Sequence, residues 1–371
     1  MNVVKNVLDR YSEGAKTRQE SLCCPVDYDS RSLANLPQEI IEKDYGCGDP
    51  SRYVREGDVV LDLGSGGGKI CYMAASLVGE QGRVIGVDMN DDMLALARKY
   101  QKQMAETIGS DRVEFHKAYI QDLALDVDAM ENYLQEKPIT NAQDLADLDA
   151  WKSQHKTQQP LIADHSVDLV ISNCVLNLVD EKQKAQLVAE IFRVLKPGGR
   201  VAISDIVSDE IVPQHLQQDP SLWSGCISGA FQEYEFLQAF VDAGFNYVSY
   251  DKWDAQPWQV VEGIEFRSVT LLASKPLGTE CIDRGHAVIY KGPFAKIYDD
   301  EGHVFIRGKR MAVCERTFKQ LIEGDLADQF IGVQPHELLP AKNWCAPHGT
   351  ERTVQETKGG LISTKTEASC C

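Results

Sequence analysis

Two short stretches of the chain combine an apolar run with residues suited to binding a cofactor. In the first, an apolar run at residues 59–63 is followed at once by Gly64, Gly66 and Gly68. Such a run is typical of a parallel strand that is buried on both faces. The glycines let the backbone turn sharply and approach a ligand closely. The helix that we expect over residues 70–77 would present unpaired N–H groups and the positive end of its dipole.

The second stretch is another apolar run, at residues 84–88, and it ends in Asp88, 24 residues after Gly64. An acidic residue at that distance and at a strand end typically accepts hydrogen bonds from ribose hydroxyls. The glycines alone would also fit a purely structural turn. A pyrophosphate site is disfavoured, because Lys69 and Cys71 stand where G-x-G-x-x-G requires its third glycine. Together the two stretches resemble the first two motifs of class I S-adenosylmethionine methyltransferases, which implies S-adenosylmethionine as the cofactor.

Cysteine is the other residue type with chemical potential, and the chain has eleven. They are Cys23, Cys24, Cys47, Cys71, Cys174, Cys226, Cys281, Cys314, Cys345, Cys370 and Cys371. Several could simply be small buried hydrophobic residues; the alternative is a soft-ligand site or thiol chemistry. A reducing compartment disfavours a structural disulfide framework. Zinc is disfavoured because no C-x-x-C pair occurs.

Cys174 is the cysteine that topology places near the cofactor. It follows the strand that we expect over residues 166–172 and therefore lies at the carboxyl edge of the sheet. Ligands of open α/β sheets bind beyond that edge, where the strand order reverses. The alternative is a buried thiol at a strand end with no chemical role.

Composition limits the class of protein. The chain has 371 residues, enough for one large domain plus a small one, and 43% of them are hydrophobic. Its net charge of −18 argues against binding to nucleic acid or to an anionic membrane surface. There is no apolar run long enough for a transmembrane helix, and residues 1–10 lack the apolar core of a signal peptide. We therefore expect a cytoplasmic protein.

Helices and strands must alternate to position these residues. Strands are expected at residues 59–63, 84–88, 113–118, 166–172, 200–206, 246–250 and 266–273, with helices between them. Strands separated by helices predict an α/β fold with a doubly wound, mostly parallel sheet. Asn90 and Asp180 are suited to capping two of the helices. A helix followed by Pro197-Gly-Gly199 and a strand is also typical of the methyltransferase fold.

The remaining segments predict the domain organisation of the chain. Residues 1–50 are expected to form a cap with helices at 3–11 and 36–42, and the loop at 45–50 is placed to cover a ligand. We predict the methyltransferase domain at 51–275, with an acidic, solvated helical insertion at 122–159, then a small α+β domain at 276–345 and a disordered tail at 346–371.

The cysteine-bearing segments make a more specific resemblance visible. The chain resembles the arsenite S-adenosylmethionine methyltransferases at residues 45–48, 61–66, 71–72, 85–89, 172–178 and 222–230. Residues 314–321 are similar to the helix of that family's small C-terminal domain. The chain departs from the family at Lys69-Ile70, where Arg-Asp is usual, and in its larger acidic insertion.

The resemblance implies a role for individual residues. Cys174 and Cys226 would hold the metalloid, Cys47 would be a third thiol, and Cys23 or Cys24 would take the place of the family's N-terminal cysteine. Around the cofactor, the residues implied are Tyr45 and Asn173 near the methionine portion, Met89, Ile120 and Gln121 beside the adenine, Asp88 at the ribose, and Gly64, Gly66 and Gly68 in the turn.

The implied reaction is methyl transfer to trivalent arsenic, for arsenic detoxification. A soft ion selects thiolate ligands, and its lone pair would attack the sulfonium methyl group. A cysteine pair would then return electrons by forming a disulfide, which thioredoxin or glutathione would reduce. We expect a monomer. Two alternatives remain open: a methyltransferase for another small molecule, and a metalloid-binding protein on a degenerate methyltransferase fold.

Overall fold

A computed structural model describes residues 3–19, 26, 28, 33–278, 280–324, 326–335, 337–344, 346–347 and 349–357. The chain divides into two compact units, Met1–Pro276 and Leu277–Cys371. Each unit is described by itself below.

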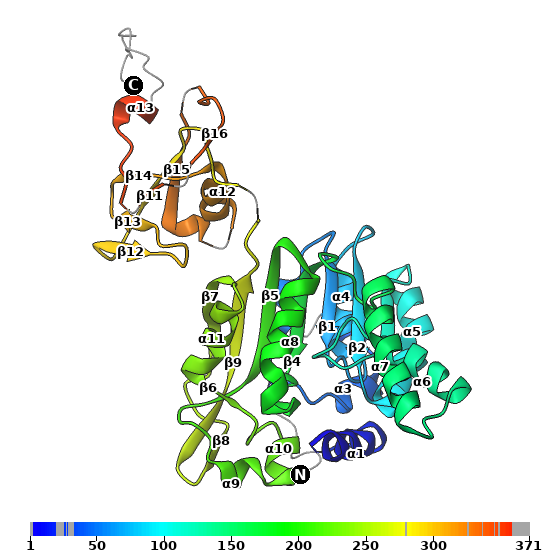
Figure 1. The fold of residues 1–371 in the computed structure, drawn as a ribbon. Coiled ribbons are helices and arrows are strands. Elements are labelled where there is room, and N and C mark those ends of the chain that lie inside the picture. The colour runs from blue at the N-terminus through cyan, green and yellow to red at the C-terminus, as the bar shows by residue number, and fades with distance from the viewer. Residues whose placement is uncertain are drawn as a thin grey trace. The chain divides into compact units, whose positions relative to one another are not determined.

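A mixed, mostly parallel sheet forms the centre of the larger unit (Figure 1). Its strand order is β3-β2-β1-β4-β5-β9-β7. The strands are β1 (Val59–Leu63), β2 (Arg83–Asp88), β3 (Val113–Lys117), β4 (Val167–Asn173), β5 (Leu195–Ser208), β7 (Asn246–Trp253) and β9 (Ile264–Ser274), with β6 (Phe231–Gln232) beside β5 and β8 (Gln259–Val261) beside β9. The strands from β3 to β5 are parallel, and β9 is antiparallel to both of its long neighbours. This confirms the predicted fold class, and the strand order reverses between β1 and β4.

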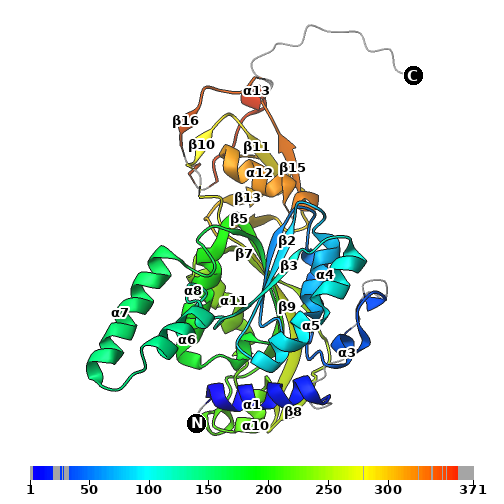
Figure 2. The same cartoon turned by 90° about the vertical axis from the view of Figure 1, so that its right-hand side faces the viewer.

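Helices cover both faces of the sheet, as Figures 1 and 2 show. On one face lie α4 (Lys69–Leu77) and α5 (Asp91–Ile108), and on the other lie α8 (Glu181–Val194) and α11 (Glu233–Asp242). Each pair closes its own apolar cluster against alternate residues of the strands. The predicted caps are confirmed: the side chain of Asn90 accepts from Met93 N, and that of Asp180 accepts from Lys182 N.

The strand β5 is longer than its apolar run predicts. It begins at Leu195 and includes the Pro197-Gly-Gly199 segment, where Gly198 has a φ of 79° and the register against β4 shifts between Val167 and Leu169. Backbone bonds between Gly198, Gly199 and Lys275 tie this segment to the end of β9. The segment therefore forms an irregularity near the start of β5, a position where proline and glycine are tolerated.

The acidic segment at 122–159 contains two helices that project from the side of the unit, α6 (Val127–Glu136) and α7 (Ala142–Gln158) (Figure 2). Both have side-chain caps, and α7 begins with a capping box between Asn141 and Asp144. Leu148 is the buried residue of α7. Stability of such a polar helix comes from its caps and ion pairs more than from apolar packing.

Short elements flank the sheet, and several of them lie at its carboxyl edge. They are α1 (Val3–Lys16), α3 (Gln38–Glu42), η2 (Pro50–Tyr53), η3 (Leu176–Leu178), α9 (Gln214–Gln217) and α10 (Pro220–Ser224). The helix α1 is longer than the expected 3–11, and it packs on α5 and α10. It lies across this edge of the sheet (Figures 1 and 2).

The smaller unit is built on the antiparallel sheet β14-β11-β15, against which α12 packs. Its elements are β10 (Ile282–Asp283), β11 (Ala287–Tyr290), β12 (Lys296–Tyr298), β13 (Val304–Ile306), β14 (Arg310–Ala312), α12 (Glu315–Glu323), η4 (Ala327–Gln329), β15 (Phe330–Val333), β16 (Lys342–Asn343) and α13 (Val354–Thr357). Tyr290, Phe305 and Phe330 meet in its core.

The prediction of a disordered tail from residue 346 onward is wrong for residues 349–357. Glu351 forms a β-bridge with Met311, and Arg352 is only 8% exposed. The guanidinium of Arg352 donates to Asp283 at 2.6 Å and to His286 O at 3.2 Å. The polar sequence of residues 349–357 did not predict an ordered segment, because an ion pair and not an apolar face holds it in place. Cys370 and Cys371 lie outside the described residues.

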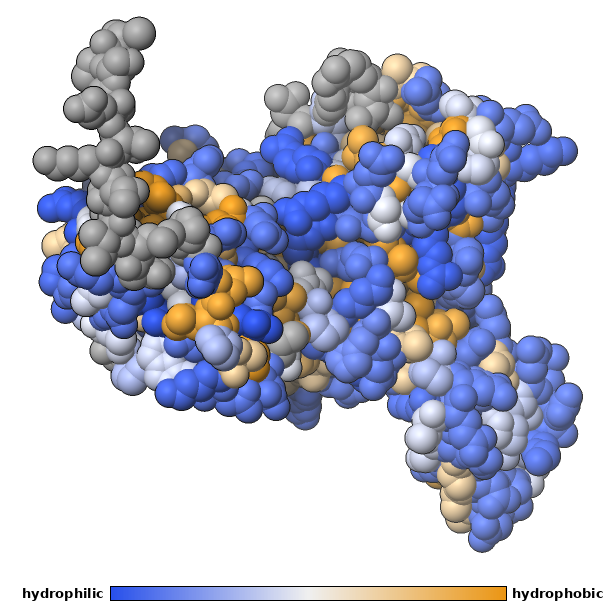
Figure 3. Space-filling view, turned by 90° about the horizontal axis from the view of Figure 1, so that it is seen from above, coloured by the Kyte–Doolittle hydropathy of each residue, from blue (hydrophilic) through white to orange (hydrophobic). Residues whose placement is uncertain are grey.

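The outer surface agrees with the high charge of the chain. The face drawn in Figure 3 is mostly hydrophilic, with hydrophobic residues in small groups. Among the helices that the structure describes, none has the length and apolarity needed to cross a membrane.

The smaller unit should depend on the segment at residues 349–357. We expect Arg352→Ala to lower its free energy of unfolding by about 3 kcal/mol, because the Asp283 side chain, which is only 14% exposed, would lose its charged partner. Thermal unfolding of the variant and of the unsubstituted protein checks this; an Arg352→Ala protein as stable as the full chain would contradict it.

Candidate active site

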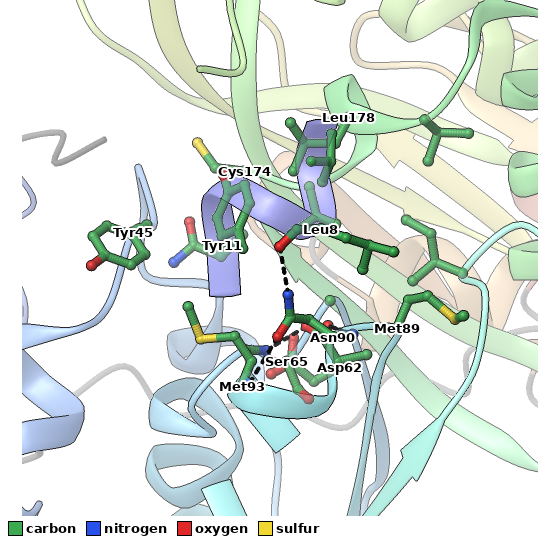
Figure 4. Close-up of a pocket in the computed structure, with 18 of the residues that line it drawn as sticks. Leu8, Tyr11, Tyr45, Asp62, Ser65, Met89, Asn90, Met93, Cys174 and Leu178 are labelled. Atoms are coloured by element: carbon green, nitrogen blue, oxygen red, sulfur yellow. Dashed lines mark hydrogen bonds between the residues drawn. The ribbon is translucent and has the colours of Figure 1, made fainter. Parts of the chain in front are cut away.

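A cavity opens at the carboxyl edge of β1, β2 and β4, where the strand order reverses (Figure 4). The glycine turn, the loop after β2 and the segment after β4 line it. Helix α1 closes it from the side opposite the sheet, through Val4, Val7, Leu8 and Tyr11. Among the predicted cofactor residues, those that line the cavity are Tyr45, Gly64, Gly66, Asp88, Met89, Ile120, Gln121 and Asn173.

The glycine turn is shaped for close approach of a ligand. Gly64 and Gly66 both have positive φ, at 72° and 50°. A Cβ on Gly64 would meet the Val175 side chain at 2.4 Å, whereas the space at Gly66 is open. Gly68 does not line the cavity; it precedes α4 with φ 85°, and a Cβ there would meet Phe115 at 2.8 Å. Its role in the structure is therefore packing between the turn and the sheet.

Asp88 ties the turn to the loop after β2. Its carboxylate accepts from Gly66 N and from Asn90 N, both at 2.8 Å. Burial raises the pKa of Asp88, and the backbone donors oppose that rise. The carboxylate lines the cavity, where it can accept hydroxyl donors of a ligand.

Among the polar residues of the cavity that were not predicted as site residues, two lie in the glycine motif. Asp62, on β1, is buried, and burial raises its pKa to about 7; it accepts a bond from the Cys71 thiol at 3.2 Å. Ser65 Oγ is buried without a hydrogen-bond partner among the described residues. Both residues stand within the glycine motif, so their position in the sequence was the available signal. An unpartnered hydroxyl and open space at Gly66 fit a polar ligand lying against the turn.

Three cysteines meet next to this cavity. Cys47 and Cys174 are joined by a disulfide with a Cα–Cα distance of 5.8 Å. The Cys226 thiol donates to Cys174 O at 3.1 Å. All three are at most 5% exposed and belong to one apolar cluster. The structure thus brings together three of the predicted site cysteines, Cys47, Cys174 and Cys226. Cys23 and Cys24 lie outside the described residues.

The loop that carries Cys47 is held by Asn173, the last residue of β4. The Asn173 side-chain oxygen accepts from Cys47 N at 2.8 Å and from Gly48 N at 3.0 Å, and its nitrogen donates to Gly48 O at 2.8 Å. A Cβ on Gly46 would lie 1.9 Å from Asn173, and one on Gly48 would lie 2.3 Å from Ser204 Oγ. The glycines on both sides of Cys47 are therefore required by close approach.

Cys174 and Cys226 share an unusual backbone conformation. Each has a φ of 62°, a region that is costly for residues with a side chain. Such residues persist only where the surrounding structure holds them, and they gather at functional sites.

Asn177 and Asp205 provide that support. The buried Asp205 carboxylate accepts from Leu176 N at 2.9 Å and from Asn177 Nδ2 at 2.8 Å, while Asn177 Nδ2 also reaches Cys226 O at 3.4 Å. One Asp205 oxygen and the sulfurs of Cys47 and Cys174 lie within 4.8 Å of one another. Among the described residues, this is the group of three side chains close enough together to hold a metal ion. Burial raises the pKa of Asp205 to about 7.

Cys174 belongs to both parts of the site, because it also lines the cavity. A ligand in the cavity would therefore end beside a cluster of sulfurs. That arrangement can bring an electrophilic group together with a soft ion bound to thiolates.

Comparison with known proteins supports this assignment. A family described as a methyltransferase domain matches residues 55–133 and 152–244. A family described as a domain of unknown function, DUF8838, matches residues 278–362 in the smaller unit. The gap in the first match falls within the α6–α7 segment.

Individual relatives extend over most of the chain. The arsenite methyltransferase of Aquipseudomonas alcaligenes is 30% identical over 349 residues, which cover 89% of this chain and 90% of that one. The arsenite methyltransferase of Mus musculus is 30% identical over 370 residues, covering 96% and 86%. The crystal structure of an arsenic (III) S-adenosylmethionine methyltransferase from Chlamydomonas reinhardtii is 29% identical, with a TM-score of 0.57 and coverage of 89% and 99%. With the glycine turn, Asp88 and the converging cysteines, these similarities show that the chain belongs to the arsenite methyltransferase family.

Proposed function

We propose that this chain transfers the methyl group of S-adenosylmethionine to trivalent arsenic held by the thiolates of Cys47, Cys174 and Cys226. The observation that carries the proposal is the position of Cys174, which lines the cofactor cavity and also contacts both other cysteines. A methyltransferase for a carbon, oxygen or nitrogen acceptor would have no use for three converging sulfurs.

The cofactor would lie along the cavity with its ribose at Asp88. There the carboxylate would accept both ribose hydroxyls, as its place at the end of β2 favours. Met89, Ile120 and Gln121 would flank the adenine. The methionine portion would lie against the glycine turn, with Tyr45 and Asn173 nearby and Asp62 and Ser65 as further polar partners. In this orientation the sulfonium group points toward Cys174.

The metalloid would enter the thiol cluster by ligand exchange. Arsenite has three hydroxyls; three thiols replace them, and three waters leave. The product is a neutral pyramidal complex with one lone pair on arsenic. Soft trivalent arsenic prefers thiolates over the carboxylate of Asp205, so Asp205 acts here through the backbone that it holds.

Methyl transfer would then be a direct displacement. The arsenic lone pair forms a bond to the methyl carbon, the bond from that carbon to the sulfonium sulfur breaks, and S-adenosylhomocysteine leaves. No general base is needed, because the nucleophile is already a lone pair. Holding both partners in contact converts a bimolecular encounter into a step within one complex.

The transfer leaves arsenic formally pentavalent, and two electrons must return. We propose that Cys47 and Cys174 supply them as thiolates and become the disulfide, while arsenic returns to the trivalent state. The bond between these two cysteines supports this pairing. A dithiol such as thioredoxin, or glutathione, would reduce the disulfide by exchange. Such a cycle would operate in the reducing cytoplasm, with a monomer as the active form. Cys23 or Cys24 would supply an additional thiol.

The cofactor assignment can be tested at Asp88. Asp88→Ala should weaken S-adenosylmethionine binding roughly tenfold to hundredfold, because hydrogen bonds to a charged group contribute about 1.5–3 kcal/mol. Isothermal titration calorimetry measures the effect, and Asp242→Ala, on the far helix α11, serves as the control that removes one carboxylate elsewhere. Unchanged affinity in a folded Asp88→Ala protein would refute the role of Asp88.

The metalloid ligands can be tested by serine substitutions. Cys174→Ser and Cys226→Ser should abolish methyl transfer to arsenite while leaving cofactor affinity nearly unchanged, because a hydroxyl does not replace a thiolate on a soft ion. Cys47→Ser should retain activity on methylarsenite, which needs only two thiols. Single-turnover assays with both substrates measure this, and Cys281→Ser in the smaller unit is the matched control. Full arsenite activity of Cys174→Ser or Cys226→Ser would exclude the assigned site.

A further inference from the structure

Tyr11 on α1 reaches the thiol cluster from the side of the cavity that α1 covers. Its hydroxyl lies 3.7 Å from Cys226 Sγ. Its ring stands edge-on to that of Tyr45, with 6.1 Å between ring centroids. Figure 4 shows Tyr11 among the cavity residues, close to Cys174. None of the sequence motifs pointed to this residue.

The contacts of α1 fix the position of Tyr11. On the side of the thiol cluster, the neighbouring Arg10 donates to Ser221 O at 2.8 Å and to Ser224 Oγ at 2.9 Å, both on α10. On the cofactor side, Asn90 Nδ2 donates to Leu8 O and to Ser12 Oγ, each at 3.0 Å. Helix α1 is therefore held both by the segment that leads into Cys226 and by the loop that follows Asp88.

The hydrogen-bond directions show how Tyr11 can act on Cys226. The Cys226 thiol donates its proton to Cys174 O at 3.1 Å, and its sulfur keeps lone pairs that can accept from Tyr11. The phenol hydroxyl of Tyr11 can donate or accept. Because the Cys226 proton is directed to Cys174 O, Tyr11 is the donor in its contact with Cys226.

We infer that Tyr11 is a positioning residue for arsenic, whose hydroxyl donates to the Cys226 sulfur and holds it in the direction from which it binds the ion. The inference rests on the proposed function. When Cys226 binds arsenic it loses the S–H proton, and with it the bond to Cys174 O. The bond from Tyr11 can remain, since a thiolate sulfur is a better acceptor than a thiol sulfur. Without it, the sulfur would be less restricted among its staggered rotamers.

The test is Tyr11→Phe, which keeps the ring beside Tyr45 and removes only the hydroxyl. Arsenite binding to the reduced enzyme should weaken about threefold to tenfold, in line with the loss of one hydrogen bond. The KM for arsenite should rise by a larger factor than the KM for S-adenosylmethionine, and the melting temperature should stay unchanged. Tyr234→Phe, on the exposed face of α11, is the matched control. Equal arsenite affinity in Tyr11→Phe and the unmodified enzyme would overturn the inference.

A double-mutant cycle separates this role from a general structural one. Calorimetric arsenite affinities are compared for the unmodified enzyme, Tyr11→Phe, Cys226→Ser and the double variant. If Tyr11 acts through the Cys226 sulfur, Tyr11→Phe should have no further effect once Cys226 is serine. An equal loss in both backgrounds would overturn the inference but leave the proposed function intact. An unmodified enzyme that neither binds nor methylates arsenite would overturn the proposed function itself.

Discussion

The site depends on one set of hydrogen bonds, those between the Asn173 side chain and the backbone of residues 47 and 48. The amide stands at the last position of β4, one residue before Cys174. It therefore fixes a loop from the N-terminal segment directly against a strand end of the sheet. Its oxygen satisfies two backbone N–H groups that would otherwise be buried without partners, and such groups are costly. The same side chain lines the cofactor cavity, so the geometry of the cavity and that of the thiols cannot vary independently.

Buried polar groups, and not apolar packing alone, hold Cys174 and Cys226 in place. Cys174 and Cys226 lie in an apolar cluster, but their left-handed backbone is not what packing alone would select. The Asp205–Asn177 pair accounts for it, because its bonds join the end of β5, the η3 turn and the Cys226 loop. Burying a carboxylate is unfavourable unless its acceptor sites are filled, and here backbone and amide donors fill them. These donors therefore offset the cost of burying the carboxylate while they hold the two cysteines in place.

The sequence predicted features that short-range patterns encode. Strand and helix alternation, the glycine turn, Asp88 and Cys174 all follow from local runs whose geometry is fixed by a few neighbouring residues. The roles of α1, Asp205 and Asn177 did not follow, because each depends on partners far away in the chain; Tyr11 and Cys226 are 215 residues apart. Gly68 was assigned to the cofactor because the motif counts glycines, whereas its actual neighbour is Phe115. The segment at 349–357 was missed because an ion pair leaves no hydrophobic pattern.

The large sequence separation between α1 and α10 also affects the order in which the protein folds during synthesis. Helix α1 leaves the ribosome well before α10, yet Arg10 binds Ser221 and Ser224, 211 and 214 residues later in the chain. Contacts between residues so far apart in sequence form late in folding, and chains fold from the N-terminus as they emerge from the ribosome. Likewise, Cys47, Cys174 and Cys226 come together only after β5 has joined the sheet and the following loop has closed. During synthesis the three sulfurs therefore come together late, and under the proposed function a nascent chain would offer trivalent arsenic separate thiols before the three-cysteine site is complete.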